Sequence, residues 1–189
     1  MFTARIIAYV STFIWLFPAI RQYKGNFFSF FLVLALLDPI TFLIRFIWQL
    51  DSMKIYASCT IFLIFSLIEI KTNKFNLFYI AVLTIINIYL SFGFSNDILK
   101  LYLILQLVIV FFIILRKTII ETFNYEQINL FFFVLVLYLL SVLTKILITF
   151  THLFLGLFYF YITTAFEIFI AVFFIFYNDI NSPKIKLNK

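Results

Sequence analysis

The sequence predicts an all-α protein, a polytopic transmembrane bundle of seven helices. Of its 189 residues, 66% are hydrophobic and 12% are charged, whereas soluble domains average about 45–50% apolar and about 25% charged residues. Seven apolar stretches fill the chain, and basic residues cluster in every second gap between them. A water-soluble core cannot absorb this much apolar surface, so we expect lipid to be the solvent.

Each apolar stretch is long enough to form a membrane-spanning helix, which needs about 20 mostly apolar residues. Unbroken apolar runs of this length exclude the alternating strands of a membrane barrel. The predicted helices span residues 4–20, 27–50, 53–70, 75–94, 97–115, 128–150 and 153–177.

Local signals mark several helix ends. Pro18 and Arg21 close the first run, which has no small-residue cleavage site after it and is therefore predicted to be a retained helix rather than a signal peptide. Asp51 is suited to cap the third helix, and Asn96-Asp97 is suited to cap the fifth.

The longest gap, 116–127, is amphipathic and is predicted to lie at the cytoplasmic interface. No Pro/Gly/Ser-rich linker interrupts the chain, so residues 1–189 are expected to form a single transmembrane domain. The tail after Tyr177 is too short to hold a soluble effector domain.

The alternation of charge predicts the orientation. Cytoplasmic loops of membrane proteins carry an excess of Lys and Arg, which places the N-terminus outside and the C-terminus in the cytoplasm. The expected location is a bacterial inner membrane. The inner cations are Arg21, Lys24, Lys71, Lys74, Arg116, Lys117, Lys184, Lys186 and Lys189.

Composition excludes several function classes. The single cysteine and single histidine, Cys59 and His152, allow neither an intrachain disulfide nor a Cys/His metal site. Three glycines build no phosphate-binding loop, and no cofactor is expected. The net charge of +6 lies at helix ends, where lipid headgroups explain it better than nucleic acid does. An intramembrane enzyme lacks a nucleophile or metal set, so no enzymatic activity is predicted.

Ionisable groups at membrane depth mark candidate functional positions. Asp38, followed by Pro39, and Glu167 lie deep in their predicted helices, where a short acid cannot reach water. Arg45 and Lys145 lie roughly 7.5 Å from their helix ends, a distance that a long side chain can span to the interface. For these two cations, interfacial anchoring is favoured over a place in a pocket.

Polar side chains on several helices predict a pocket in the outer half of the bundle. Such a pocket suits a small polar or zwitterionic solute, or proton coupling through a buried carboxylate. The alternative is that these groups pair across helices and only stabilise packing. Trp15 and Trp48 are interpreted as interfacial aromatics. The predicted substrate-binding residues are Asp38, Arg45, Gln106, Tyr138, Lys145, Thr163 and Glu167, with Ser141 and Asn87 beside them.

An internal repeat is a further hypothesis. Arg45 and then Glu69 follow one basic pair, and Lys145 and then Glu167 follow another at similar intervals. This pattern fits two parallel three-helix units joined by a fourth helix, a 3+1+3 repeat of the kind found in transporters. The alternative is coincidence, because a strong Phe/Ile/Leu bias makes any two apolar hairpins look alike.

The stretch FPAIRQYKGNFFSF, residues 17–30, resembles the end of the first helix in PQ-loop and SWEET-type transporters. That resemblance implies seven helices in a three-one-three arrangement with the N-terminus outside. Ala19 stands where that family has Gln, and no proline ends the predicted fifth helix. By overall pattern the chain is also similar to small uncharacterised seven-helix membrane proteins of AT-rich bacteria, a likeness that implies no known activity.

Two functions follow as hypotheses. The first is a small polar-solute transporter or solute-binding bundle that uses Asp38 and Glu167 as central groups. The second is a non-enzymatic signalling or accessory subunit that acts through a membrane protein partner. Membrane lipid is the partner common to both.

Overall fold

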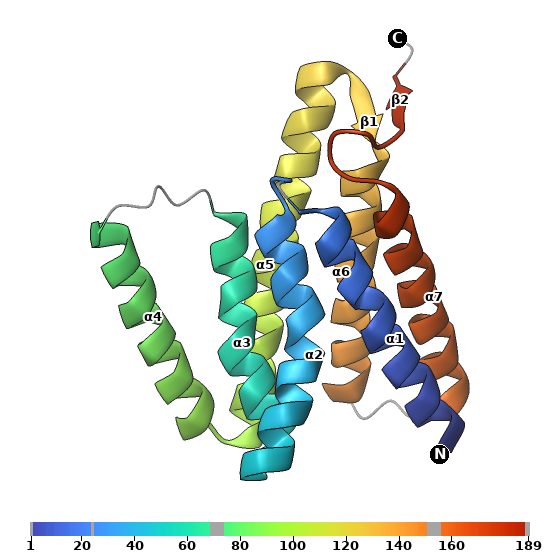
Figure 1. Cartoon of the computed structure of the whole chain (residues 1–189). Coiled ribbons are helices and arrows are strands. Elements are labelled where there is room, and N and C mark those ends of the chain that lie inside the picture. Colours follow the sequence, from blue (N-terminus) through green and yellow to red (C-terminus); the bar gives the residue numbers. More distant parts are fainter. Residues whose placement is uncertain (1, 24, 69–73, 151–155, 188–189) are drawn as a thin grey trace.

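The structure is a computed structural model that describes residues 2–23, 25–68, 74–150 and 156–187. Within these residues the chain forms seven helices and one short antiparallel ribbon (Figure 1). The all-α seven-helix prediction is therefore confirmed. The elements are α1 Phe2–Arg21, α2 Phe28–Trp48, α3 Ser52–Leu67, α4 Lys74–Gly93, α5 Asn96–Tyr125, β1 Gln127–Asn129, α6 Leu130–Phe150, α7 Gly156–Phe176 and β2 Lys184–Lys186.

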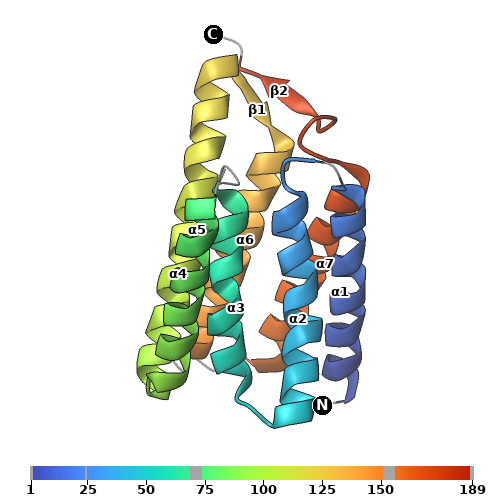
Figure 2. The same ribbon diagram turned by 60° about the vertical axis from the view of Figure 1, so that its left-hand side comes forward.

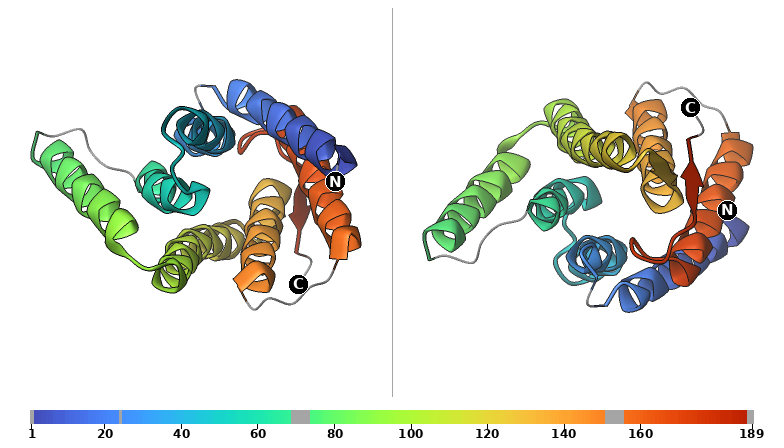
Figure 3. Two further views of the ribbon diagram at one scale, coloured as in Figure 1. Left: turned by 90° about the horizontal axis from the view of Figure 1, so that it is seen from below. Right: turned by 90° about the horizontal axis from the view of Figure 1, so that it is seen from above.

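Six of these helices form a closed ring in the order α1, α2, α3, α5, α6, α7, and α1 completes the circle against α7. Views along the bundle show the ring and place α4 outside it, beside α3 (Figure 3). The ring order joins two arcs, α1–α2–α3 and α5–α6–α7, in which corresponding helices run in the same direction (Figures 1 and 2). This is the arrangement that a 3+1+3 parallel repeat predicts, with α4 as the connecting helix.

The helices suit a multipass membrane protein. Among the described residues, five stretches are long and apolar enough to cross a membrane: Phe28–Trp48, Asn76–Gly93, Asn96–Tyr125, Leu130–Ile148 and Phe158–Phe176. Helix α3 is shorter, at 16 residues, or about 24 Å at 1.5 Å per residue. It packs between α2, α4 and α5, which are all longer.

Buried phenylalanines cluster in the interior of the bundle at one of its two ends. Ring centroids lie 4.8 Å apart for Phe31–Phe174 and 5.2 Å apart for Phe131–Phe174, in the edge-to-face geometry that aromatic pairs favour. We call this cluster the phenylalanine plug, and it closes the interior of the bundle toward one end. Its members are Phe27, Phe30, Phe31, Phe131, Phe132 and Phe174.

The ribbon lies beyond the plug. Strand β1 pairs with β2 in antiparallel register, Ile128 opposite Ile185, and Ser182 Oγ accepts a hydrogen bond of 2.9 Å from the Phe131 backbone N–H. The C-terminal segment is thereby tied to the start of α6. We call this the ribbon end of the bundle, and the opposite end, at the α2–α3 turn, the turn end.

Several predicted boundaries were wrong. Residues 116–125 do not form a gap between helices but extend α5 to Tyr125, because no Pro or Gly interrupts the helical pattern there. Pro18 lies inside α1, which ends at Arg21 as predicted. Ser95, not Asn96-Asp97, is the N-cap residue of α5. The predicted ends of the third and seventh helices, including Glu69 and its part in the repeat, fall partly in 69–73 and 151–155, outside the described residues.

One predicted cap is present. The Asp51 carboxylate accepts a hydrogen bond of 3.0 Å from the Met53 backbone N–H at the start of α3, which satisfies one of the donors left over at a helix N-terminus. This cap forms the tight α2–α3 turn and so brings the third helix back beside the second.

Asn87 attaches α4 to the ring. Its side-chain amide is buried, donates to the carbonyls of Ala57 and Ser58 in α3 at 3.3 and 2.9 Å, and accepts from the Tyr102 hydroxyl at 2.7 Å. The Gln106 amide of α5 donates to the same Asn87 oxygen at 2.6 Å. One side chain therefore joins three helices in a region where most other contacts are apolar.

We expect Asn87→Leu to lower the free energy of unfolding in detergent by about 1 kcal/mol. Interhelical polar contacts in membranes average about 0.6 kcal/mol, and this substitution removes several while leaving Tyr102 and Gln106 donors without their acceptor. Thermal unfolding and hydrogen exchange of α4 measure the effect. Ile85→Leu, at an exposed position of the same helix, is the control. An equal change in both variants would show that the Asn87 hydrogen bonds do not stabilise the attachment of α4.

Candidate functional site

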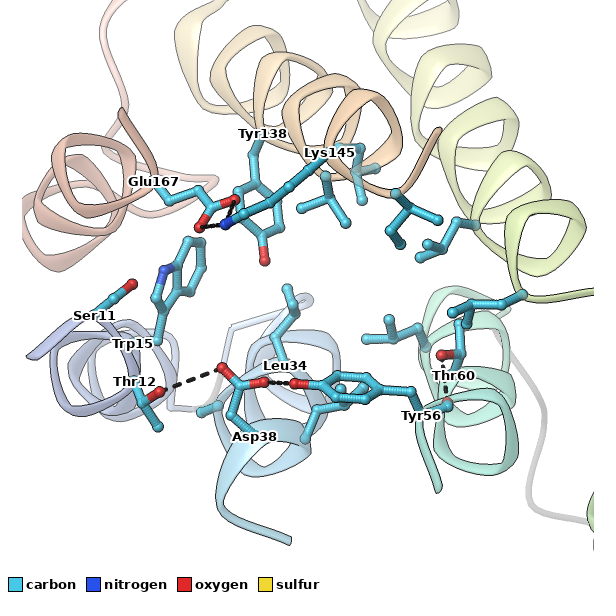
Figure 4. A pocket seen from close by; sticks show the side chains of 18 residues that line it. Ser11, Thr12, Trp15, Leu34, Asp38, Tyr56, Thr60, Tyr138, Lys145 and Glu167 are labelled. Atoms are coloured by element: carbon cyan, nitrogen blue, oxygen red, sulfur yellow. Dashed lines mark hydrogen bonds and ion pairs between the residues drawn. The ribbon is translucent and has the colours of Figure 1, made fainter. Parts of the chain in front are cut away.

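A cavity of about 330 Å³ lies inside the ring. Side chains of all six ring helices line it, and none from α4 does. Its size falls at the lower end of the range of about 300–1,000 Å³ for small-molecule sites. Most of the lining is apolar, and eight polar or charged side chains converge in it: Ser11, Thr12, Asp38, Tyr56, Thr60, Tyr138, Lys145 and Glu167 (Figure 4).

Asp38 projects from α2 between α1 and α3. Its carboxylate accepts one hydrogen bond from the Thr12 hydroxyl at 3.4 Å and another from the Tyr56 hydroxyl (Figure 4). The same three residues also border a second, more open groove between α1, α2 and α3. Asp38 is therefore exposed at the partition between the cavity and this groove.

Lys145 and Glu167 form an ion pair on the opposite wall. The Lys145 ammonium donates to both Glu167 carboxylate oxygens at 3.0 Å and lies 5.5 Å from the centre of the Phe160 ring. The Lys145 and Glu167 side chains are 30% and 12% exposed. Such a short, two-pronged contact in a low-dielectric interior neutralises both charges.

Aromatic rings separate the two walls. The Trp15 and Tyr138 rings lie 4.5 Å apart, and Trp15 also lies 6.5 Å from Phe174 of the phenylalanine plug. Both rings are buried, with 7% of each residue exposed. They form the floor of the cavity on the side of the plug, so the polar groups lie in the middle of the bundle and toward its turn end.

Pro39 adds a polar feature to the wall beside Asp38. Proline has no backbone N–H, so the carbonyl one turn earlier, at Ala35, lacks its usual helical donor. Ala35 lines the cavity. The sequence Asp38-Pro39 therefore places a carboxylate and a carbonyl without its usual helical donor on neighbouring turns of α2.

Comparison with known proteins gives this cavity no precedent. No protein family, curated protein or solved structure matches the chain. The resemblance of residues 17–30 to PQ-loop and SWEET-type transporters stays a prediction. Within the described residues, no three His, Cys, Asp or Glu side chains lie close enough together to hold a metal ion. The chemistry of the site therefore rests on its own residues.

The structure brings four of the seven predicted site residues together. Asp38, Tyr138, Lys145 and Glu167 all line the cavity. Lys145 does not anchor at the interface, as its distance from the helix end favoured, but turns inward because the Glu167 carboxylate offers it a partner within the ring. Trp15 is likewise not interfacial but buried.

The other three predicted residues lie elsewhere. Arg45 donates to the Ser52 hydroxyl at 3.3 Å beside the outer groove, near the turn end. Gln106 is buried against Asn87 in the attachment of α4. The Thr163 hydroxyl turns back onto its own helix, donating to the carbonyls of Tyr159 and Phe160 at 2.9 and 3.1 Å. None of the three lines the cavity.

Sequence reasoning missed the contributions of α1 and α3. Ser11, Thr12 and Trp15 occupy about one turn of α1, and Tyr56 and Thr60 are four residues apart on α3. Hydroxyl residues at that spacing share one helix face, which was the available signal. It was weak because a hydroxyl in a membrane helix can also bond to its own backbone, as Thr60 does to the Tyr56 carbonyl at 2.7 Å.

Proposed function

We propose that this multipass protein binds a small polar solute in its central cavity and carries it across a bacterial inner membrane. The proposed role is that of a solute carrier, without enzymatic chemistry. The observation that supports it is the convergence of three ionisable groups from α2, α6 and α7 in one cavity at the centre of the ring.

The polarity of the cavity supports a solute rather than a purely structural role. Polar pairs that only stabilise packing have no need of an accessible volume, whereas here Asp38, Lys145 and Glu167 line a cavity of about 330 Å³. Eight polar side chains against an apolar wall is the composition of a small-molecule site, in which a few polar groups set orientation and specificity.

The architecture supports alternating access. A carrier with two equivalent arcs around a central site can expose that site to either side by rocking one arc against the other. The phenylalanine plug closes the cavity toward the ribbon end, so the observed arrangement favours access from the turn end. Opening toward the ribbon end would require the two arcs to part at Phe31, Phe131 and Phe174.

We expect Val142→Phe to reduce solute binding at least tenfold without lowering the unfolding temperature. Val142 lines the cavity, and the added ring occupies solute space rather than overfilling a packed core, where extra methylenes cost about 1–3 kcal/mol. The measurement is thermal stabilisation of the purified protein in nanodiscs by a panel of small polar solutes, followed by uptake of any stabilising solute into proteoliposomes.

The matched control is Leu140→Phe, which adds the same ring at an exposed position of the same helix. It should bind and transport as the unaltered protein does. If no solute in the panel binds, or if binding survives Val142→Phe and Glu167→Gln alike, the cavity is not a solute site and the proposal fails.

A further inference from the structure

The charges in the cavity do not balance. Lys145 contributes one positive charge, whereas Asp38 and Glu167 contribute two carboxylates. Lys145 bonds to both oxygens of Glu167. Among the described residues, no Lys or Arg nitrogen lies within 4 Å of the Asp38 carboxylate, whose hydrogen-bond partners are the neutral hydroxyls of Thr12 and Tyr56.

A lone carboxylate is expensive in this environment. Asp38 is exposed within the protein but lies midway along α2, a helix long and apolar enough to cross a membrane, and an ionised group at that depth is unfavourable unless water or a counter-charge accompanies it. Two hydroxyl donors offset part of this penalty but bring no positive charge. A proton, or a cation that enters the cavity, would balance the charge of the Asp38 carboxylate.

The walls beside Asp38 suit a cation. Trp15 and Tyr138 lie across the cavity from it, and the Tyr56 ring lies beside it (Figure 4). Aromatic faces attract cations, and quaternary ammonium groups in particular are recognised by such rings. An anionic solute would meet two carboxylates. A zwitterion would find a partner for its ammonium but would have to displace Glu167 to reach Lys145.

We propose that the cavity takes a small organic cation, a protonated amine or a quaternary ammonium, that pairs with Asp38 in exchange for a proton. This rests on the proposed solute-carrier function and names its substrate class. Protonated Asp38 releases its proton as the cation binds, so that the carboxylate holds either one proton or one cation. A carrier with this rule exchanges protons for organic cations across the membrane.

Other groups around Asp38 bear on the exchange. Tyr56 of α3 faces it, Tyr9 of α1 and Arg45 of α2 border the adjoining groove, and Tyr138, Lys145 and Glu167 face it from α6 and α7. Helix α5 presents only Leu103 and Leu107. Lys145 donates to Glu167 and also attracts Asp38 electrostatically. Within the described residues, Asp38 is the cavity carboxylate that no cation contacts directly.

The test uses the full-length protein in nanodiscs with tetramethylammonium as the probe. Two further probes of similar shape are tert-butanol, which is neutral, and pivalate, which is anionic. Calorimetry measures binding, and a pH-sensitive dye in weakly buffered solution measures proton release. We expect tetramethylammonium alone to bind and to release up to one proton per cation. Once the pH is low enough for Asp38 to be protonated, the affinity for tetramethylammonium should fall about tenfold for each further unit by which the pH is lowered.

Asp38→Asn should abolish both cation binding and proton release. Asp97→Asn is the matched control, because Asp97 has an 89% exposed side chain at the start of α5, outside the cavity lining. It should leave both signals intact. If Asp38→Asn does not fold, Tyr56→Phe replaces it; losing one donor to the ion-paired carboxylate should weaken cation binding about tenfold.

The outcomes separate the two proposals. Binding of tert-butanol or pivalate that Val142→Phe abolishes, without binding of tetramethylammonium, would overturn the cation inference and leave the solute carrier standing. Cation binding without proton release, or with release that persists in Asp38→Asn, would also overturn it. If none of the probes binds, the inference fails, and the wider solute panel decides the carrier proposal separately.

Discussion

Replacing Lys145 with methionine should lower the free energy of unfolding by about 2–3 kcal/mol. The substitution keeps the apolar stem but leaves the Glu167 carboxylate, 12% exposed, without its partner. Breaking a fully buried ion pair costs about 3–5 kcal/mol. The smaller figure applies here because the pair is only partly buried, with 30% of the Lys145 side chain exposed, and both residues line the cavity, where water can solvate the remaining charge.

A double-mutant cycle measures the coupling. The free energy of unfolding in detergent is measured for Lys145→Met, Glu167→Gln and the combined variant. In the unfolded chain the charged groups are exposed to water. The double variant should be more stable than the sum of the single effects predicts, by about 1–2 kcal/mol, because it contains no uncompensated charge. Additive effects would show that the two groups are solvated independently.

The same variants separate stability from transport. Glu167→Gln keeps the shape of the side chain and should fold, but it leaves the Lys145 charge without its carboxylate partner. On the proposed function, it abolishes uptake in proteoliposomes. Uptake at the level of the unaltered protein would mean that the ion pair serves packing alone.

Phe131→Ala should lower the free energy of unfolding by about 2 kcal/mol and open the phenylalanine plug. Phe131 is fully buried, and its ring centroid lies 5.4 Å from that of Phe27 and 5.2 Å from that of Phe174. In water-soluble cores Phe→Ala costs about 3–5 kcal/mol. Part of that cost comes from the transfer of the side chain between water and the core. Separated helices in a membrane face lipid instead of water, so the expected cost here comes from the loss of packing alone.

Thiol labelling detects the opening. In a Cys59→Ser background, a cysteine at Leu135, which is fully buried next to the plug, should react about tenfold faster with a membrane-impermeant reagent after Phe131→Ala. Phe133→Ala removes the same ring from an exposed position of α6 and is the control. Equal labelling in both variants would show that Phe131 does not seal the interior.

Much of the fold could be predicted from local patterns. Apolar length located the helices, because a bilayer imposes a minimum span on any segment that crosses it. Boundaries were less predictable: α5 continues to Tyr125, since an amphipathic stretch without Pro or Gly can stay helical outside lipid. The hydrogen bonds of the ribbon to the start of α6 depend on residues far apart in sequence.

The site was predicted only in part. Asp38 and Glu167 were found because short acids deep in a membrane helix demand an explanation. Gln106 and Thr163 were misplaced because helix periodicity does not say which face meets the ring interior. An amide can join helices, as Gln106 does with Asn87, and a hydroxyl can bond to its own backbone, as Thr163 does.

The sequence by itself determined the solvent, the number of helices and the presence of deep carboxylates, because each depends on the composition of a single segment. Only the tertiary structure decided which charges meet. Lys145 reached Glu167 rather than water because α6 and α7 are neighbours in the ring. Asp38, in contrast, accepts hydrogen bonds from hydroxyls of α1 and α3, and within the described residues no cation contacts it directly. Pairing is a property of helix adjacency, and adjacency arises from packing between segments that are distant in the chain.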